Sequence, residues 1–452
     1  MRRMEKNEIV RRFLERGILL DPDAIDDLSQ LAEAELQKLI DSLAEMSVEV
    51  ASKREIEATL LGGAKHVAPR LRVLQATLTS ASDSRPDYLR FFQGRYDRIA
   101  GLIKRKAGYG EPISIVQARS AGGAFTGVVM VSDKKRTRQG HLGLVLEDPT
   151  GRLKAVVPKG SPVFAEAAKL VLDQVVGVKG EYDRRNKLLV VKDLTLPDLE
   201  EQEGPLSEAG LYAVFISDLH FGAKDFMEGA FSNFLSWTRG EFGTAEEREV
   251  ARRAGFVSIA GDLVDSTGEP GKLYSELCER LRVIPERIQI LAIPGECDAA
   301  RIPDPQPPFT EEALKALKSL KNLTAAASPC RCEMNDVPVL AYHGRSVADW
   351  MQSMGTENPC DSIQHMLASR LFAPVYGGSV PVLPSTPDPF FISEVPRIVH
   401  MGHTHRACHA RYRGVLLLST ASWLERDIGN GSGKAFVVDL STLETMVIDF
   451  GR

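Results

Sequence analysis

The sequence lacks the long apolar runs and leader features that mark membrane and secreted proteins. No stretch of about 18 consecutive apolar residues occurs in its 452 residues, so we expect no membrane-spanning helix. A basic start, Met1 to Lys6, is not followed by an apolar segment, and we therefore expect no secretory leader. Both absences predict a cytoplasmic protein that makes no membrane contact.

Cysteine is scarce and shows no metal-binding spacing. The six cysteines include no repeated CxxC pair, and Cys330 and Cys332 are too few and too close together to form a zinc knuckle by themselves. We therefore expect reduced thiols. Cys297 is set apart because it lies in a motif described below.

The chain also has no excess of positively charged residues. The formal net charge of -5 argues against a uniformly basic surface for nucleic acid, although a local basic surface is compatible with it. The net charge therefore neither supports nor excludes DNA as a partner. With 43% hydrophobic and 26% charged residues, the chain has the composition of a folded protein, and its length allows two or three domains.

Two short apolar segments end in groups that bind metals. Val214–Ile216 and Val257–Ile259 are predicted strands; the first is followed by Asp218 and His220, and the second by Asp262. Carboxyl ends of strands are where α/β folds bind ligands. These side chains therefore predict a metal site at one edge of a sheet.

Three later segments add further groups of the same kinds. Strands are predicted at 290–293, from Val339, and from Arg397, and four of the nine histidines in the chain follow predicted strands. Imidazole and carboxylate ligands together suit divalent first-row metals, and two such ions can hold both oxygens of a phosphoryl displacement. Taken singly, each group has a simpler explanation as a helix cap or a core histidine. The groups after these three strands are Glu296, Cys297, Asp298, His343, His403 and His405.

The motifs DLH, GDLVD, PGECD, YHGRS and GHTH occur in the order typical of the calcineurin-like metallophosphoesterases, which this part of the chain resembles. The longer segments IPGECDAARIPDPQPPF, RLFAPVYGG and PDPFFISEVPRIVHMGHTH resemble the small subunits of archaeal D-family DNA polymerases. The resemblance implies a two-metal 3′-to-5′ exonuclease site, with Mn²⁺ first among ions that also include Mg²⁺, Fe²⁺ and Zn²⁺. It implies the large polymerase subunit and DNA as partners, and it leaves open whether a sliding clamp also binds.

The resemblance also implies a role for each motif residue. One ion would be held by Asp218, His220 and His405, and Asp262 would bridge to a second ion held by Glu296, His343 and His403. Arg301 and Arg345 would face DNA, and Asp265 would lie next to the metal ligands. The residues expected to be catalytic are Asp218, His220, Asp262, Cys297, Asp298 and His343.

The third motif departs from the family pattern. Active relatives carry Asn and His where this chain has Glu296 and Cys297. A thiol is a poor donor to a phosphate, which predicts slow cleavage; as a thiolate, Cys297 would instead add a soft ligand that favours Zn²⁺. Two functions stay open, a proofreading exonuclease subunit and a non-catalytic scaffold of the same polymerase. A free-standing phosphatase is less favoured because other domains precede the site.

The domain pattern predicts a multidomain protein with a helical N-terminal domain, an OB-fold β-barrel and an α/β sandwich metallophosphoesterase domain. In the barrel segment, five strands with one helix, Phe164–Leu172, between the third and the fourth are typical of an OB-fold. Phe125 and Tyr182 are its plausible base-stacking aromatics, so we expect an interface module more than a strong single-strand binder. Its basic loop supplies three DNA-binding candidates: Lys134, Lys135 and Arg136. The predicted boundaries are 1–78 for the helical domain, 79–111 for a linker and helix, 112–198 for the OB-fold, 199–210 for a linker, and 211–452 for the phosphoesterase domain.

Overall fold

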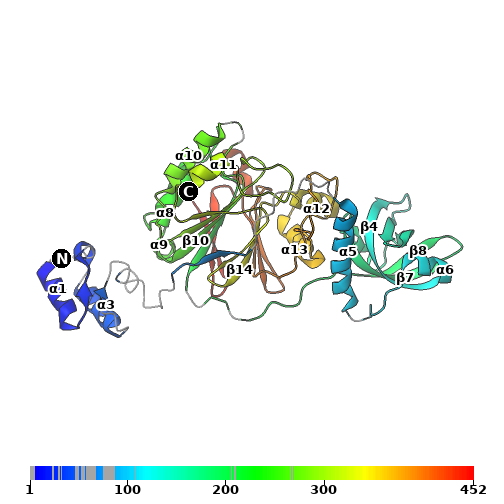
Figure 1. The fold of residues 1–452 in the computed structure, drawn as a ribbon, viewed down its shortest axis with the longest axis horizontal. Helices are drawn as coiled ribbons and strands as arrows, with labels where there is room; N and C mark the ends of the chain where they lie inside the picture. The colour runs from blue at the N-terminus through cyan, green and yellow to red at the C-terminus, as the bar shows by residue number, and fades with distance from the viewer. Residues whose placement is uncertain are drawn as a thin grey trace.

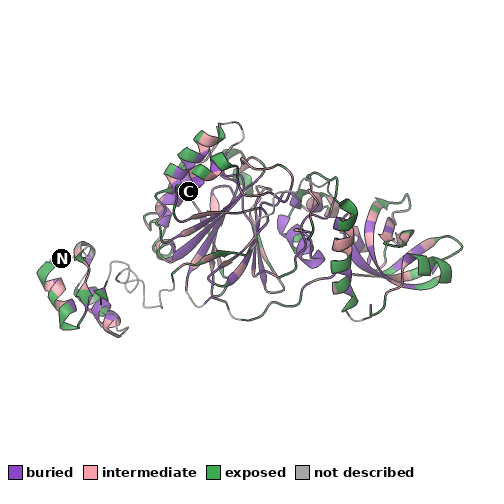
Figure 2. Cartoon of the chain, viewed as in Figure 1, coloured by how far each residue is buried: buried purple, intermediate pink, exposed green. Residues whose placement is uncertain are grey.

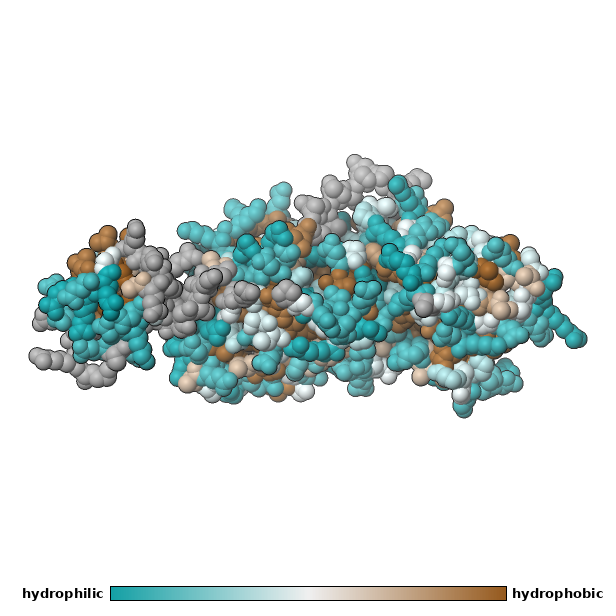
Figure 3. Space-filling model, turned by 90° about the horizontal axis from the view of Figure 1, so that it is seen from below, coloured by the Kyte–Doolittle hydropathy of each residue, from teal (hydrophilic) through white to brown (hydrophobic). Residues whose placement is uncertain are grey.

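The computed structural model places two large β-structures side by side along an elongated molecule (Figure 1). Among the described residues, no helix is both long and apolar enough to span a bilayer. The face shown in Figure 3 is mostly hydrophilic, with apolar residues scattered in small groups. The described residues are 6–22, 25–28, 31, 33–45, 50–51, 56, 68–74, 87–106, 108–204, 206–207, 210–265, 267 and 269–452.

The described residues of the N-terminal part include three helices and a two-stranded parallel sheet. The helices are α1 (Lys6–Glu15), α2 (Ile25–Leu28) and α3 (Glu33–Glu45), and β1 (Leu19–Leu20) pairs with β2 (Val50–Ala51). Apolar residues of these helices form one small core, which includes Ile9, Phe13, Leu28, Leu36, Leu39, Ile40 and Leu43. An N-terminal domain at 1–78 stays a prediction as a unit. The first part of the linker and helix expected at 79–111, residues 79–86, lies outside the described residues.

One segment assigned to the helical domain belongs elsewhere. The strand β3 (Leu71–Val73) pairs antiparallel with β13 (Cys330–Met334), at the edge of a sheet in the C-terminal half. An ion pair between Arg72 and Glu333 also joins the two strands. This strand therefore pairs outside the helical domain to which the sequence assigned it, because a three-residue strand gains its stability from a partner far away in sequence. The boundary at residue 78 stays a prediction.

The predicted OB-fold is confirmed as a closed five-stranded barrel in the order β4-β5-β6-β8-β7. The short helix α7 (Phe164–Ala168) lies between the third and fourth strands, as expected, although it is shorter than predicted. The helix α6 (Ile115–Ala121) was not predicted; Ser114 and Gln117 form a capping box at its start. The strands are β4 (Gly123–Arg136), β5 (Leu142–Asp148), β6 (Gly151–Val157), β7 (Val175–Asp183) and β8 (Leu188–Thr195).

Two expectations about the barrel surface are wrong. Phe125 and Tyr182 lie in the barrel core, with 1% and 5% of their surfaces exposed, so neither can stack on a base. The ammonium of Lys134 donates to the backbone carbonyls of Leu170 and Ser353, and burial lowers its pKa. Lys134 therefore joins the barrel to the next domain instead of facing DNA. Lys135 is exposed, and the guanidinium of Arg136 lies over the ring of Phe164.

Two six-stranded sheets form the C-terminal half, in the orders β12-β11-β10-β9-β18-β19 and β16-β17-β15-β14-β13-β3. Their inner faces enclose an apolar core, and Figure 2 shows the strands buried and the outer helix faces exposed. The strands β9, β10 and β11 run parallel, as do β14, β15 and β17, so their carboxyl ends gather at one edge. The bounds are β9 (Tyr212–Ile216), β10 (Ala254–Ala260), β11 (Gln289–Ile293), β12 (Leu323–Ala325), β14 (Val337–Tyr342), β15 (Ile398–Met401), β16 (Cys408–Tyr412), β17 (Val415–Ser419), β18 (Lys434–Asp439) and β19 (Thr445–Asp449).

Helices cover the outer faces of the two sheets. Those beside the first sheet share an apolar core with β9, β10 and β11, and those beside the second share one with β14, β15 and β17. The first group is α8 (Glu228–Thr238), α9 (Ala245–Arg252), α10 (Pro270–Leu281) and α11 (Glu311–Leu317). The second is α12 (Val347–Met354) and α13 (Pro359–Ser369). The strands predicted at the five motifs are thus all present.

The helix α5 (Tyr88–Lys104) stands between the barrel and the α12–α13 pair (Figure 1). Its residues Ile99 and Ile103 share one apolar core with Val175 of the barrel and Trp350 of α12. Its Arg95 is 1% exposed and reaches the C-terminal half, where its Nε donates to Asp388 Oδ2 at 2.7 Å. The helix expected within a linker therefore belongs to the interface between the two large β-structures.

One expectation about cysteine is wrong. Cys360 and Cys408 form a disulfide, although they are 48 residues apart in sequence. Cys360 lies at the N-terminus of α13, and Cys408 is the first residue of β16. The fold brings these two positions together. Within the described residues the cysteines outside this bond are Cys278, Cys297, Cys330 and Cys332.

His365 of α13 makes the interface sensitive to acid. Burial lowers the pKa of His365 to about 4 from the ordinary 6.5, and its ring packs edge-on against Trp350. Because the unfolded chain takes up this proton first, stability falls as the pH drops through the window from 6.5 to about 4. The expected loss from this group is on the order of 3 kcal/mol, at about 1.4 kcal/mol per pKa unit.

Urea unfolding at several pH values tests this expectation. His365→Gln should flatten the fall in unfolding free energy between pH 6.5 and 4 relative to the native chain. His409→Gln is the matched control, because His409 is an exposed histidine on β16. An unchanged slope in His365→Gln would contradict the assignment.

Candidate metal centre

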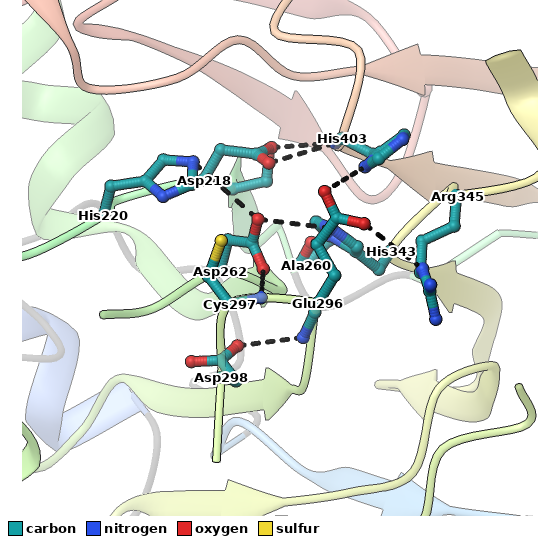
Figure 4. Close-up of polar contacts among 12 residues, drawn as sticks. Asp218, His220, Ala260, Asp262, Glu296, Cys297, Asp298, His343, Arg345 and His403 are labelled. Atoms are coloured by element: carbon teal, nitrogen blue, oxygen red, sulfur yellow. Dashed lines mark hydrogen bonds and ion pairs between the residues drawn. The ribbon is translucent and has the colours of Figure 1, made fainter. Parts of the chain in front are cut away.

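Every sequence-predicted ligand lies at the carboxyl-end edge of the two sheets, and Figure 4 labels all of them except His405. The side chains come from turns that directly follow β9, β10, β11, β14 and β15. Parallel neighbours in each sheet align these turns, and the two sheets face each other across the central core. Residues spread over almost 190 positions of the chain thus meet at one place.

Five of these residues have a left-handed backbone, which non-glycine residues rarely adopt. Each such residue costs of the order of 1 to 3 kcal/mol and persists only where its surroundings enforce it. Here the backbone N–H of Asp218 donates to the backbone carbonyl of Gly261, and that of His220 donates to the backbone carbonyl of Asp262, at 2.9 Å each. The φ values are 50° for Asp218, 47° for His220, 51° for Asp262, 65° for His403 and 54° for His405.

Two glycines are required by the close approach of ligand side chains. A Cβ on Gly295 would lie 2.2 Å from Asp262 Oδ1, and a Cβ on Gly402 would lie 2.4 Å from Asp218 Oδ2. Real Cβ atoms essentially never approach other atoms this closely. The glycines in PGECD and GHTH therefore make room for the carboxylates.

The first group of candidate ligands consists of Asp218, His220 and His405. The Nε2 atoms of His220 and His405 lie 3.2 Å apart, and Asp218 Oδ1 lies 3.5 Å from His405 Nε2. On its other side, His405 Nδ1 lies 2.7 Å from Asp427 Oδ2. Burial lowers the pKa of His405, but the carboxylates of Asp218 and Asp427 outweigh burial and raise the pKa to about 9. A carboxylate behind a histidine is typical of metal sites, because it orients the ring.

Asp262 lies between this group and a second one. Its Oδ2 is 3.8 Å from His220 Nε2 and 3.6 Å from His343 Nε2. Burial raises the pKa of Asp262. A carboxylate buried between two imidazoles has the position that the bridging role requires.

His343 shows most directly that the residues fit a cation. Its Nδ1 lies 2.8 Å from the backbone carbonyl of Ala260, which can only accept, so the proton is on Nδ1. In the neutral ring, Nε2 then carries a lone pair; this fully buried atom has no hydrogen-bond partner among the described residues, and Asp262 Oδ2 lies 3.6 Å from it. Buried polar atoms rarely stay unpaired. A divalent cation beside Asp262 would satisfy this nitrogen.

Glu296 and His403 lie on the more open side of the site. Glu296 Oε1 is 3.6 Å from His403 Nδ1, and Glu296 Oε2 is 3.4 Å from the Nε of Arg345. Arg345 is itself anchored, because its Nη1 donates to the carbonyl of Ile302 and contacts Asp304. Arg345 thus holds Glu296 instead of standing free to meet DNA. Arg301 is also occupied, donating to the carbonyl of Pro305 at 2.6 Å.

Asp298 takes a different place from the one expected. Its carboxylate accepts from the backbone N–H groups of Leu263 and Gly295 and from the hydroxyl of Tyr274 at 2.6 Å. Burial, followed by the charge of Asp262, raises the pKa of Asp298 to about 6. Asp298 therefore ties the β10 and β11 turns together, and we correct its role from catalytic to positioning. Similarly, Asp265 accepts from Thr267 within its own turn.

Sequence reasoning missed two partners of the site. Asp427, which orients His405, lies on the short helix η2 (Glu425–Asn430), and Tyr274, which holds Asp298, lies on α10. No local motif marks either residue. An acidic residue after a strand pair and a tyrosine on a helix are too common to be selected from the sequence.

Comparisons with known proteins cover most of the chain. The family of the B subunits of DNA polymerases alpha and epsilon matches residues 259–409, and an OB-fold nucleic acid binding domain matches residues 125–196. The DNA polymerase II small subunit of Methanothermobacter thermautotrophicus is 29% identical over 459 residues, covering 92% of this chain and 93% of that protein. That of Archaeoglobus fulgidus is 31% identical, covering 75% and 70%.

Two further similarities are more limited. The DNA polymerase II small subunit of Pyrococcus furiosus is 33% identical over 80% of this chain, which spans 63% of the length of that relative. The solved structure of an archaeal phosphodiesterase matches 53% of this chain and 99% of its own at 13% identity, with a TM-score of 0.28. A score this low establishes no common arrangement.

Proposed function

The chain belongs to the family of DNA polymerase II small subunits, and we propose that it carries a two-metal site that removes nucleotides from the 3′ end of DNA. Its partners would be the large catalytic subunit of the polymerase and DNA, and it would act in the cytoplasm. The matches to small subunits and to an OB-fold nucleic acid binding domain support these partners. A sliding clamp stays a prediction, because nothing among the described residues bears on it.

The unpaired Nε2 of His343 is the observation that carries the proposal. Bound divalent ions, Mn²⁺ foremost, would supply Lewis acidity to a phosphodiester. Asp262 would hold both ions, while Asp218, His220 and His405 face one and Glu296, His343 and His403 face the other. Asp427 would keep the ring of His405 in its binding orientation.

Glu296 and Cys297 would make this site slow. Burial, with the charge of Asp262 next, raises the pKa of the Cys297 thiol, so in the metal-free protein it stays protonated and donates weakly. Arg345 and His403 engage Glu296 from two sides. We therefore expect measurable but low nuclease activity.

Digestion of a 3′-mismatched, end-labelled primer with Mn²⁺ tests the function. The full chain, alone and with its large subunit, should shorten the primer slowly from the 3′ end, and Asp262→Ala should abolish this because neither ion would keep its shared ligand. Asp336→Ala is the matched control, since Asp336 is exposed and pairs with Arg70. Equal digestion by Asp262→Ala would refute the assigned site, and silence of the assembled complex would favour the scaffold role.

A further inference from the structure

The side chain of Cys297 lies among the candidate metal ligands. Its ligand atom, with one from His220 and one from Asp262, forms a group whose members all lie within 4.8 Å of one another. Its backbone N–H donates to Asp262 Oδ1 at 2.8 Å, which fixes the residue beside that carboxylate. In Figure 4 the sulfur lies between the His220 ring and the Asp262 carboxylate. The side chain is therefore placed to reach the same cation as its two neighbours.

The position of His220 identifies that cation. His220 also belongs to the group formed with Asp218 and His405, and its Nε2 is 3.2 Å from His405 Nε2 and 3.8 Å from Asp262 Oδ2. Because His220 is common to both groups, the cation that it binds would lie near Cys297 as well as near Asp218 and His405. Asp218 and His405 lie on one side of His220 and Asp262 and Cys297 on the other, whereas the second position has Asp262 together with His343, Glu296 and His403.

We propose that Cys297 is a thiolate ligand of the ion between Asp218, His220 and His405, and that this ion is Zn²⁺. The inference rests on the proposed metal site. As the sulfur–metal bond forms, the thiol proton passes to solvent, and no oxidant or reductant is needed. Thiolate ligands select Zn²⁺ over harder ions such as Mn²⁺. A position filled by protein ligands is typical of structural sites, whereas a catalytic ion keeps an open position.

A thiolate ligand at Cys297 would explain physically why the third motif differs from the family pattern. A thiolate on the first ion would take the place that a substrate oxygen needs. The sequence left open whether Cys297 acts as a weak donor or as a ligand. Its distance from His220 and Asp262 favours the ligand. The same ion would then hold together the turns after β9, β10, β11 and β15.

Cobalt substitution in the full chain tests the assignment without measuring catalysis. After removal of metals with a chelator, Co²⁺ should produce visible ligand-field bands together with a near-ultraviolet sulfur-to-cobalt band. Cys297→Ser should lose the sulfur band and keep the ligand-field bands, because the histidines and carboxylates remain. Cys278→Ser is the matched control, since Cys278 is a cysteine of α10 away from the site, and it should keep both.

Competition between Zn²⁺ and Mn²⁺ provides an independent measurement. The native chain should retain Zn²⁺ in an equimolar mixture, and Cys297→Ser should lower the Zn²⁺-to-Mn²⁺ ratio about tenfold or more. A sulfur band that persists in Cys297→Ser, or ligand-field bands without a sulfur band in the native chain, would overturn the inference and leave the metal site intact. Absence of all cobalt bands in the native chain would overturn both the inference and the proposed function.

Discussion

The Cys297→His variant is expected to remove 3′ nucleotides on the order of 10² to 10³ times faster than the native chain, which corresponds to about 3 to 4 kcal/mol of transition-state stabilisation. The imidazole restores a donor at the position next to Asp262, and it removes the soft ligand from the first ion. Loss of an electrostatic group of this kind costs a similar factor in other enzymes. The measurement is the rate of primer shortening with Mn²⁺, in complex with the large subunit.

Cys297→Ala separates the two contributions. If only the gain of a donor matters, the alanine variant stays as slow as the native chain. If the thiolate inhibits by occupying the ion, the alanine variant is also faster, though less so than the histidine variant. A histidine variant no faster than the native chain would show that Glu296, still paired with Arg345, limits the rate, and would contradict the prediction.

The Arg95→Met variant is expected to lose about 3 to 5 kcal/mol of unfolding free energy, because it leaves a buried carboxylate without its charged partner. All three nitrogen positions of the Arg95 guanidinium are engaged: with Asp388 at 2.7 Å, and with the carbonyls of Pro374 at 2.7 Å and Ala373 at 3.2 Å. Asp388 is equally enclosed, since its side chain is 1% exposed. Urea unfolding followed by circular dichroism measures the loss.

A double variant distinguishes charge burial from simple loss of packing. Arg95→Met with Asp388→Leu should recover most of the stability, because replacing both members of a buried pair by apolar groups is often neutral. Arg90→Met on the same helix is the surface control, and it should change stability by less than about 0.5 kcal/mol, since Arg90 is exposed. A double variant as unstable as Arg95→Met would contradict the explanation.

Much of the fold follows from local patterns in the sequence. The apolar runs before Asp218, Asp262 and His343 predict buried strands, since only a strand covered on both faces tolerates such runs. The alternating strand pattern of the barrel segment, with one helix inserted, was sufficient to predict the OB-fold, which the structure shows as a closed barrel. The order of the motifs likewise predicted which side chains meet, because carboxyl ends of parallel strands share an edge.

Other features depend on contacts between distant parts of the chain. Lys134 lies in a basic run, yet the docking of the barrel on α12 turns it into an interface residue. Asp298 has the sequence position of a catalytic residue, yet Tyr274 and two backbone N–H groups take its carboxylate. The bond between Cys360 and Cys408 joins elements that no spacing rule connects.

The sequence by itself determined the strands, the barrel and the identity of the residues at the candidate metal site, because hydrophobic period and motif order are local properties. Only the tertiary structure decided the left-handed turns that aim Asp218 and His405, the placement of Asp427 behind His405, and the unpaired nitrogen of His343. These features need neighbours from distant strands to enforce a strained backbone and to bury a polar atom, and such neighbours exist only once the two sheets have packed together.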